Sequence, residues 1–177
     1  METTTVEQQV EQNQELRVLL EILIQTCRDG GIGFRDAAKA IHDPQLRGLL
    51  DRYAVRRMSF VGELQLEAKH QGMDMDAAGN LPGTLHKGWL NLNAAMTSGD
   101  EAAILLECEH AEDAAVEEYV KAMQRDLAPS LLRLLGSQCN QIEEVREQIH
   151  KLRLTCQRQA DGKEGLALES QNPPATD

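Results

Sequence analysis

The chain has 177 residues, of which 41% are hydrophobic and 27% are charged, a balance typical of a single globular domain. Its formal net charge of -11 argues against binding to nucleic acid or to anionic membrane surfaces, because both carry negative charge themselves. Aromatic residues make up only 3%, so the core has to be built from aliphatic side chains, which favours helices over sheets.

The sequence contains no apolar run near the roughly 20 residues that a membrane-spanning helix needs. It starts with METTTVEQQVEQNQ, which lacks the basic start and the apolar stretch of a secretory signal. Its four cysteines include no CxxC pair and are expected to be free thiols in a reducing compartment. We therefore expect a cytoplasmic protein without a membrane partner.

A first long helix is predicted over residues 6–41, where apolar residues recur at steps of three and four. Gly30, Gly31 and Gly33 interrupt its apolar pattern. Each helical glycine costs about 1 kcal/mol relative to alanine, so a packing reason is expected. The favoured interpretation is close packing of a neighbouring helix against the bare backbone, or a kink. The alternatives are a functional break in the helix and a ligand pocket beside these glycines.

A second helix is predicted over residues 44–70. Asp43 is expected to cap its first turn, and Pro44 suits the first helical position. Because the preceding connection is so short, the first two helices should be antiparallel neighbours.

Residues 71–99 are expected to form a long connection that is irregular at first and then contains a short helix over 84–96. A connection of this length can span the bundle from end to end. Trp89 lies on the apolar face of the short helix and is expected to anchor the connection to the bundle. The alternative is that His86 and Trp89 form a small surface for a ligand or a partner.

The same periodicity predicts a third helix over residues 100–126 and a fourth over 130–157. No segment shows a strand pattern. We expect a flexible N-terminus at 1–5, a helical bundle domain at 6–157 and a disordered tail at 158–177, which lacks periodicity.

Three short motifs suggest a family: CRDG followed by GF, then LHKGW, then ECE followed by EDAA. On these motifs the chain resembles bacterial ferritin-like four-helix-bundle proteins of unknown function, over about residues 16–153. The resemblance implies an all-α, ferritin-like four-helix bundle, with a long crossover containing a short fifth helix between helices two and three. Family members often carry an acid at the position of Ile32 and a histidine near Arg146, and this chain has neither.

Ferritin-like di-iron sites need inward carboxylates on two helices and a Glu-x-x-His pair on each of the other two. The chain has three such pairs: Glu67/His70, Glu107/His110 and Glu147/His150. Helical geometry turns the last two pairs toward solvent, and the first helix offers no acid on its inner face. A complete site is therefore not expected, and the residues left as candidate ligands for iron or manganese are Glu63, Glu67, His70 and Glu112.

Arg57, Glu112 and Arg146 fall near the inner faces of three helices, each close to the helix midpoint. An unpaired charge in a bundle core is costly, so Glu112 is expected to be matched by arginine. The favoured interpretation is a structural layer of buried ion pairs that fixes helix register. The alternative is a variant of a metal layer, although arginine in place of histidine repels a cation.

The leading hypothesis is a non-enzymatic bundle that interacts with another protein or with a second copy of itself. The resemblance to ferritin-like proteins implies a storage-like role, which extends to a stress-related one. No catalytic residue is assigned, because Cys27, Cys108 and Cys139 lie on apolar faces where thiolate formation is disfavoured. The alternative function is a metal-dependent oxidoreductase or metal-binding protein that uses iron or manganese at mid-bundle carboxylates.

Overall fold

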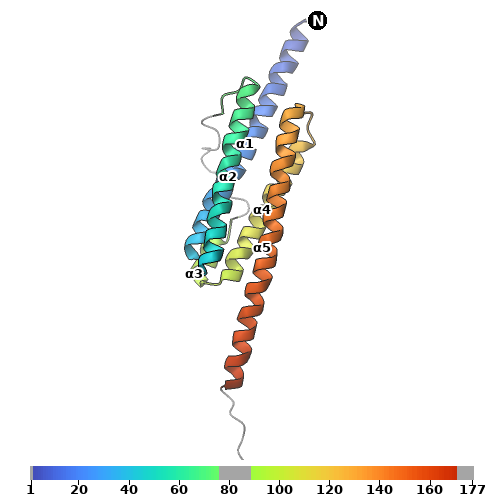
Figure 1. The fold of residues 1–177 in the computed structure, drawn as a ribbon. Helices are drawn as coiled ribbons and strands as arrows, with labels where there is room; N and C mark the ends of the chain where they lie inside the picture. The colour runs from blue at the N-terminus through green and yellow to red at the C-terminus, as the bar shows by residue number, and fades with distance from the viewer. Residues whose placement is uncertain (1, 76–88, 171–177) are drawn as a thin grey trace, which may run out of the picture.

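The computed structural model describes residues 2–75 and 89–170, and these form five α-helices and no strand (Figure 1). The helices are α1 (Glu2–Ala40), α2 (Pro44–His70), α3 (Leu92–Ser98), α4 (Glu101–Met123) and α5 (Pro129–Ser170). The all-α prediction is thus confirmed. Within the described ranges, no helix combines the length and the apolar character that crossing a membrane requires.

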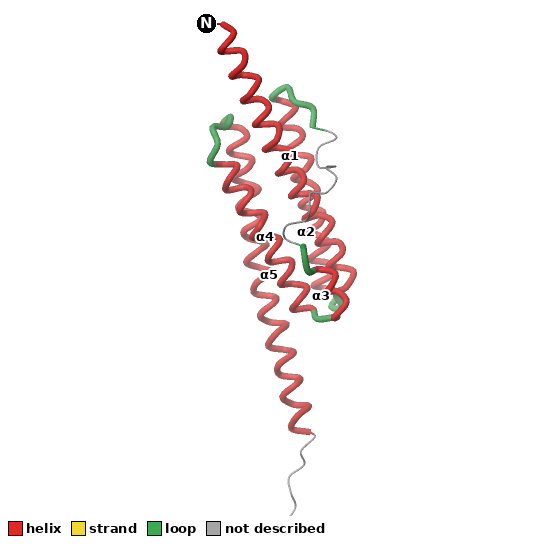
Figure 2. Tube along the Cα trace, turned by 180° about the vertical axis from the view of Figure 1, so that it is seen from behind, coloured by secondary structure: helices red, strands yellow, loops and turns green. Residues whose placement is uncertain are grey.

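The four long helices lie side by side, with α1 antiparallel to α2 and α4 antiparallel to α5 (Figures 1 and 2). At one end, the backbone N–H of His42 donates to Glu101 Oε1 at 2.7 Å, which ties the α1–α2 turn to the start of α4. At the other end, the Ser130 hydroxyl donates to Glu67 Oε1 at 2.6 Å, so the end of α2 meets the start of α5. It follows that α2 and α4 run in the same direction.

Local capping explains where two of the helices begin. Asp43 Oδ1 accepts hydrogen bonds from the backbone N–H groups of Gln45 at 2.7 Å and Leu46 at 3.0 Å, which confirms its predicted capping role. The side chain of Asp100 likewise accepts from the N–H of Ala102 at 2.9 Å. Each carboxylate satisfies N–H groups that a first helical turn leaves without a partner.

The core divides into two apolar clusters along the bundle axis. One cluster contains Leu20, Leu64 and Leu135, and the other contains Ile41, Leu50 and Ile104. Every phenylalanine and tyrosine of the chain is also buried: Phe34, Tyr53, Phe60 and Tyr119. The few aromatic residues are therefore concentrated in an otherwise aliphatic core.

The three glycines of α1 allow close packing of side chains from elsewhere in the bundle. A Cβ atom on Gly33 would lie 2.2 Å from Trp89 Cε2, and one on Gly31 would lie 2.9 Å from Met58 Sδ. Packing of a neighbouring helix is confirmed for Gly30 and Gly31, which meet side chains of α2, whereas Gly33 meets Trp89 in the segment before α3. Side chains rather than a ligand pocket therefore lie against these glycines. Trp89 is the anchor that was predicted, packing edge-on against Phe34 at 5.4 Å between ring centroids.

Several element boundaries differ from those predicted. Helix α1 begins at Glu2, within the expected flexible N-terminus, and α5 continues through residues 158–170, which were expected to be disordered. Both extensions project beyond the bundle (Figure 1). They lack an apolar stripe, so a search for apolar periodicity does not predict them as helices. The short helix spans Leu92–Ser98 rather than 84–96, because residues 89–91 precede it without being helical, while 76–88, with His86, lie outside the described residues.

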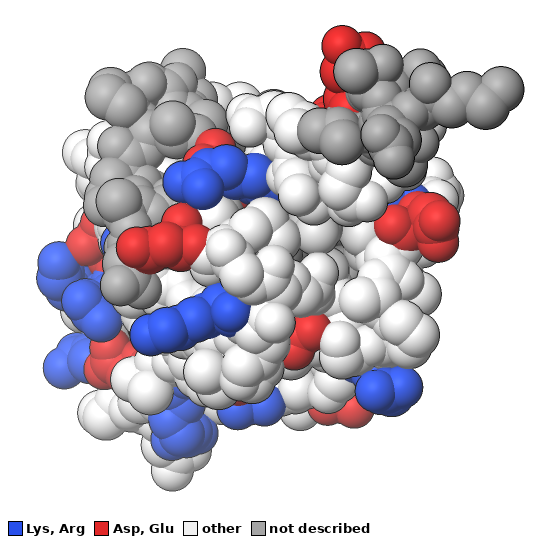
Figure 3. Space-filling view, turned by 90° about the horizontal axis from the view of Figure 1, so that it is seen from above, with Lys and Arg blue, Asp and Glu red and all other residues white. Residues whose placement is uncertain are grey.

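Seen along the bundle axis, acidic and basic side chains are interspersed with uncharged ones over this end of the molecule (Figure 3). Neither acidic nor basic side chains predominate on the visible face. At this end of the molecule the acidic side chains are therefore not gathered in one patch.

Candidate functional site

A buried ion pair joins α2 and α4 at the middle of the bundle, between the two apolar clusters. Arg57 Nη2 donates to Glu112 Oε1 at 2.6 Å, and the two side chains are only 4% and 1% exposed. Gly30 on α1 leaves room for the guanidinium, since a Cβ atom there would lie 3.2 Å from Arg57 Cγ. The structure thus brings together two of the three residues that the sequence placed in a buried layer.

Arg146 is not part of this buried layer, which corrects the sequence-based expectation. Its Nη1 atom donates to Asp113 Oδ1 at 3.0 Å, and the two side chains are 40% and 53% exposed. Asp113 follows Glu112 on α4, and one residue turns a helix by about 100°. This rotation carries the Arg146–Asp113 pair to the surface between α4 and α5.

Burial and pairing shift the pKa values of Arg57 and Glu112 in opposite directions. For Arg57, burial lowers the pKa, but the nearby Glu112 carboxylate outweighs it and the pKa is raised above its usual value. For Glu112, burial raises the pKa, and Arg57 offsets only part of that increase. Because a guanidinium does not lose its proton in a protein, Glu112 serves as its counter-ion.

The ion pair is not fully satisfied by the bundle. Within the described part of the chain, the buried Arg57 Nη1 and Glu112 Oε2 atoms have no hydrogen-bond partner. Leaving such a buried group unpaired costs about 1–3 kcal/mol. The pair therefore keeps one donor and one acceptor that a bound molecule could satisfy.

A chain of hydrogen bonds crosses the bundle next to the ion pair and touches all four long helices. Gln138 Nε2 on α5 donates to Glu63 Oε2 on α2 at 2.8 Å, and Tyr119 on α4 donates to Gln138 Oε1 at 2.7 Å. The Cys27 thiol on α1 lies 3.1 Å from the Tyr119 oxygen. Because the Tyr119 proton goes to Gln138, the thiol is the donor in this contact.

Sequence analysis did not single out Gln138, although a signal was present. It follows Leu131 and Leu135 at helical spacing and precedes Ile142, so it falls on the apolar stripe of α5. In the structure its exposure is 0%. A lone amide on an apolar stripe indicates a buried hydrogen-bond partner, here Tyr119.

The buried thiols and the buried phenol are held in their protonated forms. Burial raises the pKa of Cys27, and Arg57 opposes this only in part. Burial also holds the pKa values of Cys108 and Tyr119 well above their usual ranges. This arrangement disfavours a thiolate nucleophile in the middle of the bundle.

The structure does not bring the four candidate metal ligands together. Glu63 accepts from Gln138, and Glu112 is paired with Arg57. Glu67 accepts from Ser130, which lowers its pKa below the usual 4.5, and the His70 side chain beside it is 66% exposed. In the part of the chain that the structure describes, no group of three or more His, Cys, Asp or Glu side chains could hold a metal ion.

The outward direction predicted for the other two Glu-x-x-His pairs holds for their histidines, since the side chains of His110 and His150 are 52% and 48% exposed. It is wrong for Glu107, which is only 6% exposed. Its carboxylate accepts a hydrogen bond from the backbone N–H of Asn91 at 3.1 Å. The segment leading into α3 covers this side of α4, which the helical spacing of α4 alone could not predict.

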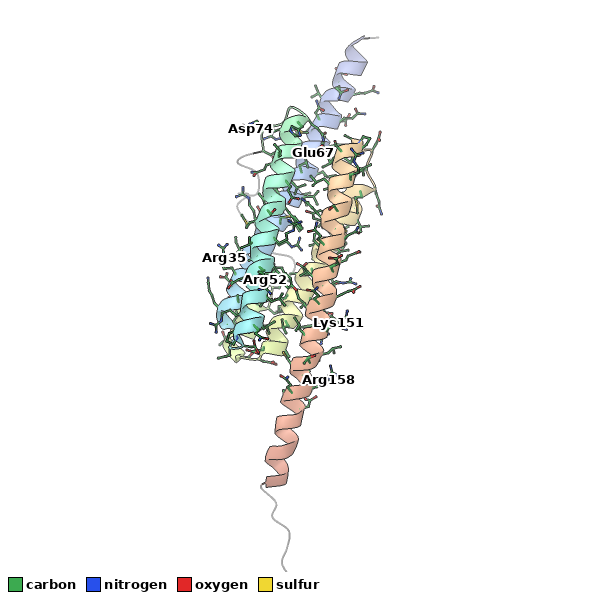
Figure 4. All side chains as sticks on the ribbon, viewed as in Figure 1. Arg35, Arg52, Glu67, Asp74, Lys151 and Arg158 are labelled. Atoms are coloured by element: carbon green, nitrogen blue, oxygen red, sulfur yellow. The ribbon has the colours of Figure 1, made fainter. Side chains whose placement is uncertain are left out.

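A cavity of about 280 Å³ opens between α2 and α5, and the ion pair lines part of its wall. Helix α1 packs along α2, and α4 packs along α5, whereas α2 and α5 make few contacts with each other. The cavity lies on this loosely packed side. Figure 4 labels Arg52, an exposed side chain of α2 that lines the cavity.

Comparison with known protein families gives a match over residues 16–125, to a family described as a domain of unknown function, DUF2383. No curated protein matches the chain. The matched segment contains Arg57, Glu112 and Tyr119, but it ends before Gln138 and the rest of α5. Because the match covers more than half of the chain, this protein belongs to the DUF2383 family.

Proposed function

We propose that this protein is a ferritin-like four-helix bundle of the bacterial cytoplasm that acts by binding, in an interaction, storage-like or stress-related role, rather than by catalysis. The single connection that returns the chain between the parallel helices α2 and α4 supports a ferritin-like topology. The unknown activity of the family is compatible with this proposal.

The observation that carries the non-catalytic proposal is the position of Arg57. Its guanidinium lies at mid-bundle, 2.6 Å from Glu112, where ferritin-like di-metal proteins place their ligands. A permanent positive charge at this place repels a divalent cation. It also occupies one oxygen of the only candidate metal ligand that is fully buried.

The second candidate is a metal-dependent oxidoreductase that uses iron or manganese. The unpartnered Oε2 atom of Glu112 favours it, since a carboxylate oxygen suits either ion. However, Glu67 lies ten residues beyond Arg57 on α2, which corresponds to roughly 15 Å along a helix axis. The helices would have to shift substantially for Glu67, His70 and Glu112 to share one ion.

Metal analysis of the full chain distinguishes the two candidates. The protein is purified without chelator, incubated with Fe²⁺ or Mn²⁺, desalted and analysed by mass spectrometry, together with the Glu112→Gln variant. Glu117→Gln serves as the matched control, because Glu117 is an acid of the same helix with a side chain 65% exposed. We expect a low metal content that is equal in all three proteins.

A stoichiometric metal content in the wild type would contradict the binding proposal if it is lost in Glu112→Gln and kept in Glu117→Gln. That outcome would place Glu112 among the metal ligands and favour the oxidoreductase. Metal retained equally by all three proteins would point to unspecific association with the acidic surface.

The partner that we propose is a second copy of the chain, which docks on the outer face of α1 and α2. This face, the α1–α2 apolar face, is defined by Ile32, Val55, Met58 and Leu66, which are 50%, 66%, 40% and 57% exposed. The three α2 residues recur at helical spacing on one side of α2. Exposed apolar residues that share one side of a helix favour a protein–protein contact.

A further inference from the structure

The cavity between α2 and α5 has the wall of a small-molecule site. Three aromatic rings line it, from Phe34, Tyr53 and Phe60, together with the aliphatic side chains of Ile142 and Val145. Ligand sites are typically apolar and aromatic, with a few polar groups that orient the ligand, and have volumes of about 300–1,000 Å³. At about 280 Å³, this cavity suits one molecule with a single ring.

Part of the wall is polar and incompletely hydrogen-bonded. Arg57 and Glu112 line the cavity, are 3% and 1% exposed, and keep one donor and one acceptor without a partner among the described residues. A hydroxyl or amide group both donates and accepts, so it can satisfy both atoms at once. A ligand with such a group at its inner end would suit this pair.

Two hydrogen bonds join α2 to α5 at the cavity, and neither involves Arg52. Arg56 Nε donates to Gln141 Oε1 at 2.7 Å, and the Tyr53 hydroxyl donates to Gln148 Oε1. Arg52 lines the same cavity, is exposed, and makes no hydrogen bond or ion pair within the described part of the chain. Its guanidinium is therefore available to an anion at the mouth.

The charges around the cavity differ in sign from those of the whole chain. Three arginines line it, against the two acids Glu112 and Glu144, whereas the chain as a whole carries a net charge of -11. A positive site in a negative protein indicates an anionic ligand. Planar guanidinium groups suit a carboxylate because they can donate two parallel hydrogen bonds to it.

We propose that this cavity binds a small aromatic carboxylic acid that carries a hydroxyl or amide group. The carboxylate lies at Arg52, the ring packs among Phe34, Tyr53 and Phe60, and the second polar group contacts the Arg57–Glu112 pair. The proposal goes beyond the proposed function and does not depend on whether the bundle binds metal or forms dimers.

The test uses 4-hydroxybenzoate as the probe and measures its dissociation constant with the full chain by protein-observed NMR titration. We expect saturable binding at one site, and weaker binding by about tenfold in Arg52→Gln, as for the loss of one charge-assisted hydrogen bond. Arg35→Gln is the matched control, because Arg35 is an exposed arginine on α1 that does not line the cavity (Figure 4). The Arg35→Gln variant should bind the probe with the same dissociation constant as the wild type.

Two further comparisons test the location and the charge of the ligand. Val145→Trp fills the cavity and should abolish binding while the helical circular dichroism signal is retained. The uncharged analogue 4-hydroxybenzamide should bind about tenfold more weakly than the acid. If Val145→Trp does not fold, the comparison of Arg52→Gln with Arg35→Gln decides the proposal.

Three results would each overturn the proposal. The first is the absence of saturable binding up to on the order of 10 mM probe, beyond the weakest affinity of a useful site. The second is undiminished binding by folded Val145→Trp. The third is an equal loss of affinity for the probe in Arg52→Gln and Arg35→Gln, which would indicate that surface charge attracts the anion without a specific site. None of these results bears on metal content or oligomeric state.

Discussion

Arg57 and Glu112 each make the burial of the other tolerable. Removal of one partner from a buried pair leaves the other charge without compensation, whereas replacement of both by apolar residues is often neutral or stabilising. In this protein the pair also lines a cavity, where under the ligand proposal its charges would orient the bound molecule. We therefore expect the pair to contribute more to ligand specificity than to stability.

This expectation gives a prediction for the free energy of unfolding. Glu112→Ala should lower it by about 3–5 kcal/mol, because the Arg57 charge is left buried and unpaired. The double variant Glu112→Leu/Arg57→Met should recover most of that loss. Denaturant unfolding followed by circular dichroism measures both values.

Asp113→Ala provides the control at the next position of α4. It breaks the exposed pair with Arg146, and exposed pairs contribute only about 0–1 kcal/mol. A Glu112→Ala variant no less stable than Asp113→Ala would show that the buried pair does not hold the helices in register.

At the scale of elements, the docking of the segment before α3 depends on the bare backbone of α1. Gly33 meets the six-membered ring of Trp89, and Trp89 packs against Phe34, which itself lines the cavity. The end of the long connection is thus coupled through aromatic contacts to the wall of the proposed ligand site.

Gly33→Ala should therefore destabilise the protein, although alanine favours a helix by about 1 kcal/mol over glycine. The added Cβ atom would lie 2.2 Å from Trp89 Cε2, so the indole must move away. Because Trp89 is the only tryptophan of the chain, its fluorescence should shift to longer wavelength as it becomes more exposed. Fluorescence spectra and denaturant unfolding measure both effects.

Gly62→Ala is the matched control on α2, since a Cβ atom there would have no neighbour within 4 Å. It should stabilise the protein by up to about 1 kcal/mol through helix propensity alone. If Gly33→Ala were as stable as Gly62→Ala, the contact between Trp89 and α1 would not hold the connection in place.

For the whole molecule, the α1–α2 apolar face predicts self-association. We expect dimers at micromolar concentration in sedimentation velocity experiments, and mostly monomers for Leu66→Glu, because a charge in an apolar contact is costly to desolvate. Val120→Glu is the control, since Val120 is an exposed apolar residue on α4. A wild-type protein that is only monomeric at these concentrations would contradict the self-association proposal.

Local features of the sequence were enough to predict where the four long helices lie, and for α2 they also predicted its bounds. The predicted bounds 44–70 agree with those of α2, because Asp43 and Pro44 mark its start through contacts within a few residues. Helical spacing alone also predicted that Arg57 and Glu112 face the core, since this depends only on about 100° of rotation per residue.

Contacts between helices decided which side chains pair with each other and where the cavity lies. The partner of Arg146 depends on how α5 is rotated against α4, and the burial of Glu107 depends on the segment before α3. The cavity depends on the distance between α2 and α5. The sequence by itself therefore determined an acidic, all-helical chain with two charges in its core. Only the tertiary structure decided which groups meet and where space remains, because both depend on packing between elements far apart in the chain.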